Sequence, residues 1–154
     1  MDKSKSLWGE LLAGDVSHTP LTILREQGDI LTQMTKGVLE GIVSTTTLPK
    51  ALPSLAYNLT GVGAISGLLP SVLRATLSII APKLDGYIFQ VLQVDYELDR
   101  YPVTVYDDVN KIPYTCADEK AFVDAVKEVL SSEQVRKAIG LLLAQSHSEQ
   151  QNAA

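Results

Sequence analysis

The sequence predicts an α+β fold, in which helices at both ends of the chain flank an antiparallel sheet of about four strands. Apolar residues recur at helical spacing near the two ends, over residues 20–36 and 118–146. Between these segments, alternating and β-branched runs surround the dipeptide Asp85-Gly86, which is typical of a tight hairpin turn. Because strands joined by a short turn pair antiparallel, this order predicts one sheet in a single domain spanning residues 1–154.

The N-terminal part is expected to form two helices. A helical extension over residues 1–16 is predicted by an apolar stripe, namely Leu7, Trp8, Leu11 and Leu12. Thr19 suits the N-cap of the next helix, and Pro20 suits its first position because the missing N–H is not needed there. This second helix is expected to run to about Lys36.

Four segments have the residue pattern of strands, namely 38–47, 73–81, 87–98 and 101–106. In the third segment, strict alternation would place Ile88 on the same face as Leu92 and Val94. Pro102 suggests that the fourth strand lies at an edge of the sheet, since proline cannot donate a ladder hydrogen bond. Residues 107–116 are rich in turn-forming residues and are expected to be a loop.

The C-terminal part is expected to form two helices and a tail. Apolar stripes predict one helix over residues 118–130 and a second that ends near Ser146. Ser131 fits the N-cap of the second helix, with Gln134 completing a capping box three residues later. Residues 147–154 are polar and are expected to be a disordered tail.

The composition indicates a globular protein with an acidic balance. Thirteen basic residues stand against 18 acidic ones, giving a formal net charge of −5, which argues against non-specific binding to nucleic acid or anionic lipid. The single cysteine, Cys116, cannot form an internal disulfide, and no apolar run of signal-peptide length precedes Gly14. We therefore expect a cytoplasmic protein, and no motif implies a cofactor.

An almost uncharged stretch is the most unusual feature of the chain. Between Gly41 and Pro82, the only residues of the Asp, Glu, Lys and Arg types are Lys50 and Arg74. Residues 48–73 within it are expected to form a long apolar crossover between the first two strands. Large aliphatic side chains recur in it at three- and four-residue steps, namely Leu52, Leu55, Leu59, Val62, Leu69 and Leu73. The candidate interaction residues are Leu52, Leu55, Leu59, Val62, Leu68 and Leu69.

Several interpretations of residues 48–73 are open. A membrane span is disfavoured because Pro53, Pro70 and Asn58 interrupt the apolar run and a strand pattern resumes directly after it. A nucleotide-binding loop is disfavoured because the glycines of residues 61–67 are spaced one residue too far apart. Two interpretations remain: the segment packs on its own sheet, or it presents its aliphatic residues to a protein partner or a second copy.

Acidic residues in and after the third strand are the candidates for chemistry. Asp95, Glu97 and Asp99 follow the alternation of one strand face, and Asp107 comes soon after them. Such carboxylates could bind Mg²⁺ or Ca²⁺. The alternative is a charged strand that discourages aggregation.

Four stretches of the sequence resemble a group of small uncharacterised bacterial proteins. The motifs are SHTPLTILREQGDILTQMTKG, LSIIAPKLDGYIFQVLQV, LDRYPVTV and KEVLSSEQVRKAIGLLLAQS. The resemblance implies a bacterial α+β protein with no assigned activity. Members of the group join the first two strands by a shorter and more polar loop, from which residues 48–71 of this chain depart.

The sequence therefore favours a non-enzymatic protein that interacts with a partner or with itself through residues 48–73. The alternative is a small metal-dependent enzyme that uses the acidic residues of the third strand.

Overall fold

A computed structural model describes residues 19–49, 71–97 and 101–152. Its elements are α1 (Pro20–Met34), β1 (Glu40–Pro49), β2 (Ser71–Ala81), the 3-10 turn η3 (Pro82–Leu84), β3 (Tyr87–Tyr96), β4 (Val103–Asp107), β5 (Ile112–Cys116), α4 (Glu119–Leu130) and α5 (Glu133–Asn152). All five strands are antiparallel and follow the order β1-β2-β3-β4-β5. The predicted α+β class is confirmed, with one strand more than expected.

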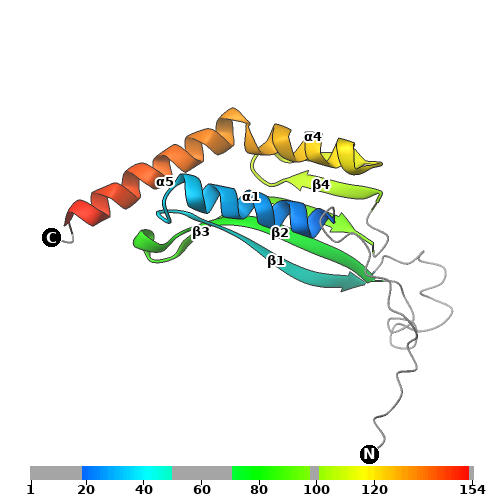
Figure 1. The fold of residues 1–154 in the computed structure, drawn as a ribbon, viewed down its shortest axis with the longest axis horizontal. Coiled ribbons are helices and arrows are strands. Elements are labelled where there is room, and N and C mark those ends of the chain that lie inside the picture. Colours follow the sequence, from blue (N-terminus) through cyan, green and yellow to red (C-terminus); the bar gives the residue numbers. More distant parts are fainter. Residues whose placement is uncertain (1–18, 50–70, 98–100, 153–154) are drawn as a thin grey trace, which may run out of the picture.

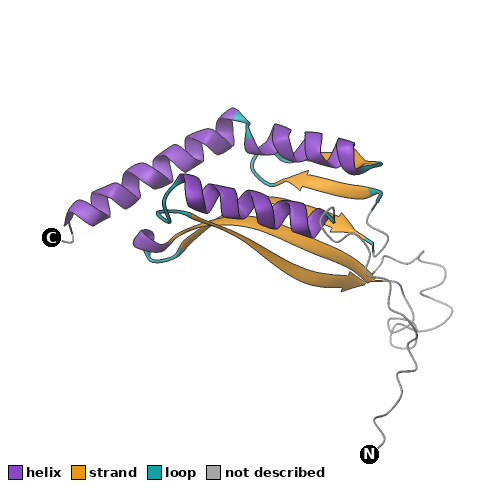
Figure 2. Ribbon diagram, viewed as in Figure 1, coloured by secondary structure: helices purple, strands orange, loops and turns teal. Residues whose placement is uncertain are grey.

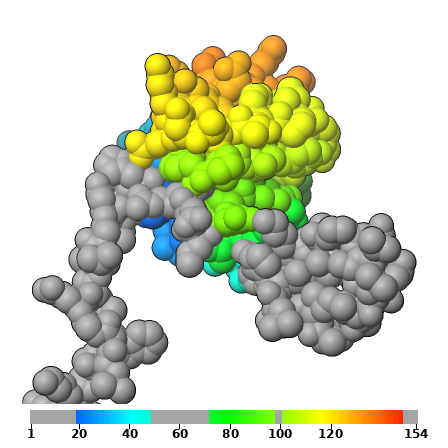
Figure 3. Space-filling model, turned by 90° about the vertical axis from the view of Figure 1, so that its right-hand side faces the viewer, coloured from blue at the N-terminus to red at the C-terminus, as the bar shows by residue number. Residues whose placement is uncertain are grey.

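The helices lie together on one side of the sheet (Figures 1 and 2). Helix α1 packs mainly on β1 and β2, whereas α4 packs on β3, β4 and β5. A view from the end of the molecule shows α4 and α5 above the strands (Figure 3). Between the two layers lies one hydrophobic core, whose largest fully buried apolar side chains are Phe122, Leu24, Leu39, Leu92, Val91, Val94, Val103, Val105, Val129 and Val135.

Helix α1 begins as its sequence predicts. The Thr19 hydroxyl accepts a hydrogen bond from the backbone N–H of Thr22 at 3.1 Å, and Pro20 occupies the first turn. The helix ends at Met34, slightly before the predicted end, because the chain turns there through Lys36 and Gly37 with φ values of 54° and 81°. This turn brings β1 back beneath the helix.

Two glycines set how closely α1 approaches β1. A Cβ atom built on Gly28 would lie 2.7 Å from the carbonyl oxygen of Gly41, and one built on Gly41 would lie 2.5 Å from Gly28 Cα. Both distances are shorter than non-bonded atoms allow, so only glycine fits at either position. The Thr32 hydroxyl fixes the same junction by accepting a hydrogen bond from the Gly41 N–H at 3.0 Å.

The hairpin predicted from Asp85-Gly86 joins β2 and β3, but its turn is longer than predicted. Ala81 pairs with Tyr87, so residues 82–86 connect the strands, and η3 forms the first three of them. Asp85 has a φ of 58° and Gly86 a φ of 70°. Both residues have positive φ, a conformation that glycine adopts freely and that Asp tolerates, which explains the preference for Asp-Gly at this place.

A β-bulge in β3 overturns part of the predicted alternation. Leu77 pairs with Leu92 while the next residue, Ser78, pairs with Gln90, so Val91 is an extra residue. Val91 and Leu92 are both fully buried, and Ile88 is 60% exposed. The prediction that Ile88 shares a face with Leu92 is therefore wrong, because the bulge reverses the alternation between them.

Strand β5 lies in the region that was expected to be a loop. Residues 107–116 contain the end of β4, a turn through Lys111 with a φ of 60°, and β5. The expected edge position of the strand after Pro102 is also wrong, because β4 pairs with β3 on one side and β5 on the other. Pro102 precedes β4, so it removes no hydrogen bond from the ladder.

The C-terminal helices differ from prediction at two boundaries. Asp118 caps α4 by accepting a hydrogen bond from the Ala121 N–H at 2.8 Å. The cap of α5 is Ser132 and not Ser131, because the Ser132 hydroxyl accepts from the Val135 N–H at 3.3 Å. Helix α5 continues to Asn152, into the residues that were expected to form a tail.

Candidate functional site

The predicted interaction segment is attached to the end of a fully paired hairpin. Strands β1 and β2 are neighbours, and their ladder continues to the pair Pro49 and Ser71. Residues 50–70 therefore connect two adjacent strand ends and do not cross over another strand. The predicted contact residues of this segment lie outside the described residues, namely Leu52, Leu55, Leu59, Val62, Leu68 and Leu69.

Asp95 is held in an ion pair on the sheet face that lies away from the helices. Its two carboxylate oxygens accept hydrogen bonds from Nε and Nη2 of Arg74 at 2.7 and 2.9 Å. Hydrogen bonding to Asp95 raises the pKa of Arg74. Because each side chain is about one-third exposed, at 36% and 34%, this pair contributes little to stability.

Asp107 is buried on the opposite face of the sheet and holds the turn between β4 and β5. One carboxylate oxygen accepts from the backbone N–H groups of Val109 and Asn110 at 2.9 and 3.0 Å. The other accepts from the Asn110 side-chain amide at 2.8 Å. The three bonds offset the cost of burying this carboxylate, which is only 1% exposed.

The acidic candidates therefore do not converge on one site. Asp107 pairs with Leu92, which faces the core, whereas Asp95 lies three residues further on and faces the other side. Glu97 is exposed beyond the end of β3, and Asp99 lies outside the described residues. Within the described part of the chain, no three residues of the His, Cys, Asp and Glu types form a group that could hold a metal ion.

The sheet face away from the helices is mainly polar. Besides the Arg74–Asp95 pair, the amides of Gln90 and Gln93 donate to the Asp108 carboxylate, at 2.6 Å and 3.2 Å respectively. Strand β1 contributes alternate hydroxyl side chains to this face. Such a face is suited to contact with solvent and not to packing against an apolar segment such as residues 48–73.

An apolar groove lies between α1 and the pair α4 and α5. Helix α1 packs on β1 and β2, whereas α4 packs on β3, β4 and β5, and the groove lies between them. Leu77, Ile79 and Val91 of the sheet form its floor. Its walls are mainly aliphatic, and include Ile23, Ile30, Leu31, Met34, Leu130 and Ile139. The part of the groove over the sheet has a volume of about 200 Å³, and the part between α1 and α4 has a volume of about 530 Å³.

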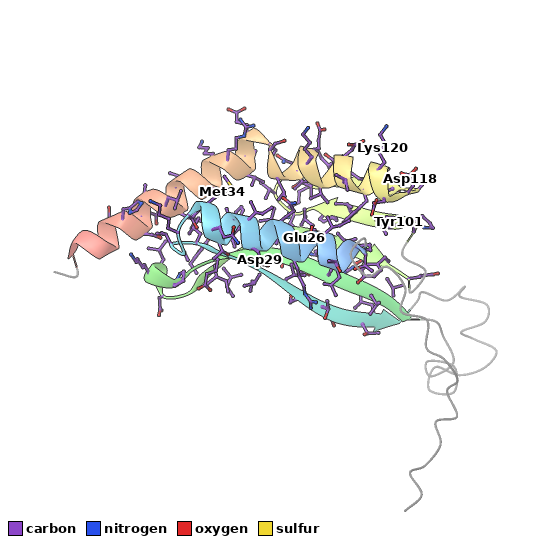
Figure 4. All side chains as sticks on the ribbon, in the orientation of Figure 1. Glu26, Asp29, Met34, Tyr101, Asp118 and Lys120 are labelled. Atoms are coloured by element: carbon purple, nitrogen blue, oxygen red, sulfur yellow. The ribbon has the colours of Figure 1, made fainter. Side chains whose placement is uncertain are left out.

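Two apolar side chains that line this groove, Met34 and Ile30, are exposed to solvent. Met34 is 76% exposed and lies at the end of α1 next to α5 (Figure 4), and Ile30 is 44% exposed. The sequence reveals the apolar stripe of α1 but gives no sign that α4 and α5 leave part of it uncovered. Among the described residues, the groove lining contains no carboxylate, histidine or thiol that could carry acid–base or nucleophilic chemistry.

Cys116 has the properties of a core residue. Its side chain is 1% exposed, and burial raises the pKa of its thiol. A buried thiol with a raised pKa is a poor nucleophile, because the thiolate is the reactive form.

No helix within the described ranges is long and apolar enough to cross a membrane. Comparison of the chain with protein-family models, curated proteins and solved structures finds no match. The resemblance to small bacterial proteins therefore stays a prediction, and any function has to be argued from the geometry of this chain.

Proposed function

We propose that this protein is a non-enzymatic interaction module that binds a protein partner, or a second copy of itself, through residues 48–73. One observation carries the proposal. The β1–β2 ladder is paired up to Pro49 and Ser71, so residues 50–70, whose only charged residue is Lys50, connect two adjacent strand ends.

The fold itself does not require so long a connection. Two residues suffice to join paired antiparallel strands, and long loops in compact domains usually have a function. Residues 51–70 contain no charged side chain and carry the aliphatic set that includes Leu59 and Leu68. Aliphatic residues that gather on a surface typically mark a site of interaction.

The geometry gives no comparable support for a metal-dependent enzyme. Asp95 is bound by Arg74, and Asp107 is bound by the turn that follows it. The two carboxylates also lie on opposite faces of the sheet. A catalytic site would need these groups to face a common substrate.

A pair of neighbouring substitutions tests the proposal. Leu59→Asp removes a large aliphatic side chain and adds a charge, whereas Asn58→Asp adds the same charge next to it and removes no aliphatic group. We expect Leu59→Asp to weaken self-association in light scattering, or to lose a protein captured from lysate by the unaltered chain. We expect Asn58→Asp to keep it, with equal melting temperatures for both variants.

Equal behaviour of the two variants would contradict the proposal. If both retain association, the aliphatic side chain is not part of the contact. If both lose it, charge in general and not this surface is responsible. Leu68→Asp repeats the comparison at a second position of the aliphatic set.

A further inference from the structure

In the described sheet, β1 is an edge strand whose middle lacks the features that usually protect edges. It is ten residues long, its register with β2 has no bulge, and its only charged residue is Glu40 at the start. Strand β5, at the other edge, has five residues, contains Pro113 and follows Lys111. Short length, proline and nearby lysine are devices that prevent edge pairing, and in β5 they affect the whole strand. In β1 the proline and lysine stand only at the end, at Pro49 and Lys50, so residues 42–48 stay open to another strand among the described residues.

Two observations show which residues of β1 point their backbone groups outward. The Gly41 N–H donates to the Thr32 hydroxyl and so is not used in the β2 ladder. Pro49 has no N–H, and proline is tolerated in an edge strand only where that group would face outward. Backbone N–H and C=O groups alternate in direction along a strand, and Gly41 and Pro49 are an even number of residues apart. Both therefore indicate that the backbone groups of the odd-numbered residues point away from β2.

Three residues therefore carry outward N–H and C=O groups between these two ends, namely Val43, Thr45 and Thr47. Within residues 19–49, 71–97 and 101–152, no hydrogen bond uses these outward groups. The side chains of Thr45 and Thr47 are exposed as well.

We propose that β1 pairs antiparallel with β1 of a second copy, around a twofold axis through Thr45, to form a continuous ten-stranded sheet. This inference concerns the strand itself, so it stands independently of the function proposed for residues 50–70. In this register Thr45 faces Thr45 of the other copy, and Val43 faces Thr47. Each of the three pairs exchanges two backbone hydrogen bonds.

The ends of β1 fit the same register. Gly41 lies opposite Pro49 of the second copy, and this pair would otherwise need an N–H from each residue. Pro49 has none to give, and the N–H of Gly41 is already bound by Thr32. No hydrogen bond is therefore lost at either end. With the axis at Val43, Thr45 would lie opposite Gly41, and with the axis at Thr47 it would lie opposite Pro49. In either case Thr45 would face a residue that has no free N–H to donate.

The side chains are compatible with this pairing too. On the face away from the helices, Ile42 meets Leu48 and Ser44 meets Thr46, so no like charges oppose each other. Helix α1 runs opposite to β1 and contacts it at the Gly41 end (Figure 1). The twofold axis therefore sets the closest helix–strand contact of each copy against the Pro49 end of the other.

A cysteine pair tests both the contact and its register. Thr45→Cys places two thiols across the axis at a Cα separation of about 5.5 Å, which a disulfide can span. Thr46→Cys is the matched control, because the two thiols would then lie two residues out of register and beyond disulfide reach. Cys116 is buried and adds no accessible thiol. Under mild oxidation, we expect rapid covalent dimers from Thr45→Cys and not from Thr46→Cys.

The unaltered chain should also dimerise without a cross-link. Light scattering is expected to give twice the 16.7 kDa chain mass at high concentration. Thr45→Pro removes an outward N–H from each copy and should raise the dimer dissociation constant about tenfold or more. If Thr45→Pro does not fold, Thr45→Lys serves instead, because it places like charges across the axis.

Two results would overturn the inference. One is a chain that stays monomeric up to millimolar concentration, with Thr45→Cys no faster to cross-link than Thr46→Cys. The other is a dimer that Thr45→Pro or Thr45→Lys leaves unchanged at native melting temperature. A dimer that survives these substitutions but is lost in Leu59→Asp would refute pairing through β1 and support the function proposed for residues 48–73.

Discussion

At Gly28 and Gly41, a helix and a strand meet with no side chain between them. The backbone of α1 lies directly on the backbone of β1, and the neighbouring Thr32 hydroxyl bonds both Gly28 and Gly41. This junction fixes the position of α1 over the edge strand. It also leaves the Gly41 N–H satisfied, although Gly41 lies in an edge strand.

Gly28→Ala should therefore destabilise the protein. The new methyl group would lie 2.7 Å from a backbone oxygen that cannot move without shifting β1. We expect a loss of about 1–3 kcal/mol in the free energy of unfolding, which is typical of overpacking. Gly140→Ala in α5 is the control, since nothing lies within 4 Å of its added Cβ. It should stabilise by about 0.5–1 kcal/mol through helix propensity. Urea denaturation measures both, and equal effects would contradict this view of the junction.

Asp107→Ala should be costly because the carboxylate satisfies buried donors in a turn. Removing it leaves the N–H groups of Val109 and Asn110 without their acceptor. We expect a loss of about 1–3 kcal/mol. Asp95→Ala breaks a partly exposed ion pair and should cost no more than about 1 kcal/mol. Thermal and urea unfolding of the two variants would contradict this assignment if Asp95→Ala proved the more damaging.

Local signals at single residues could be predicted, and roles set by distant neighbours could not. Thr19, Pro20 and Asp85-Gly86 act within a few residues of themselves, and the structure confirms all of them. Asp107 has a residue type that fits a metal site as well as a turn. Its turn role is fixed by two features of the structure: it pairs with Leu92 on the core face, and it accepts a hydrogen bond from the turn that follows it.

At the scale of elements, two of the errors come from pairing between strands. Strand β5 contains Pro113 and follows a polar turn, so its own composition indicates a loop, yet its pairing with β4 makes it a strand. The bulge at Val91 shifts the faces of β3 by one residue, and strict alternation cannot reveal such a shift. Both features are set by the partner strand.

The boundary between α4 and α5 gives a prediction at this scale. Ser132→Ala should cost about 0.5–2 kcal/mol, because it removes the N-cap of α5. Ser131→Ala is the matched control. Its hydroxyl donates to the Lys127 carbonyl in an exposed place, so the loss should stay within about 0.5 kcal/mol. A larger loss from Ser131→Ala in urea denaturation would restore Ser131 as the cap.

At the scale of the whole molecule, the sheet formed by the described residues has one face covered by helices, one polar face, one protected edge and one edge that no other described residue pairs with. The α+β class follows from the order of sequence patterns and is confirmed. The groove between α1 and the C-terminal helices and the outward groups of β1 could not be predicted, because both depend on how elements sit beside one another. These features describe a scaffold that presents surfaces and holds no convergent catalytic groups among its described residues.

The most direct test of this account replaces residues 50–70 with Asn-Gly. Pro49 and Ser71 are already paired, and Asn-Gly closes such a pair as a tight turn. The shortened chain should keep the melting temperature and circular dichroism spectrum of the fold. The test is made in the Thr45→Lys background, in which pairing through β1 is blocked. In light scattering and capture from lysate, the shortened chain should lose the association that Leu59→Asp also disrupts. A shortened chain that folds and still associates as the full-length Thr45→Lys chain does would contradict the central claim.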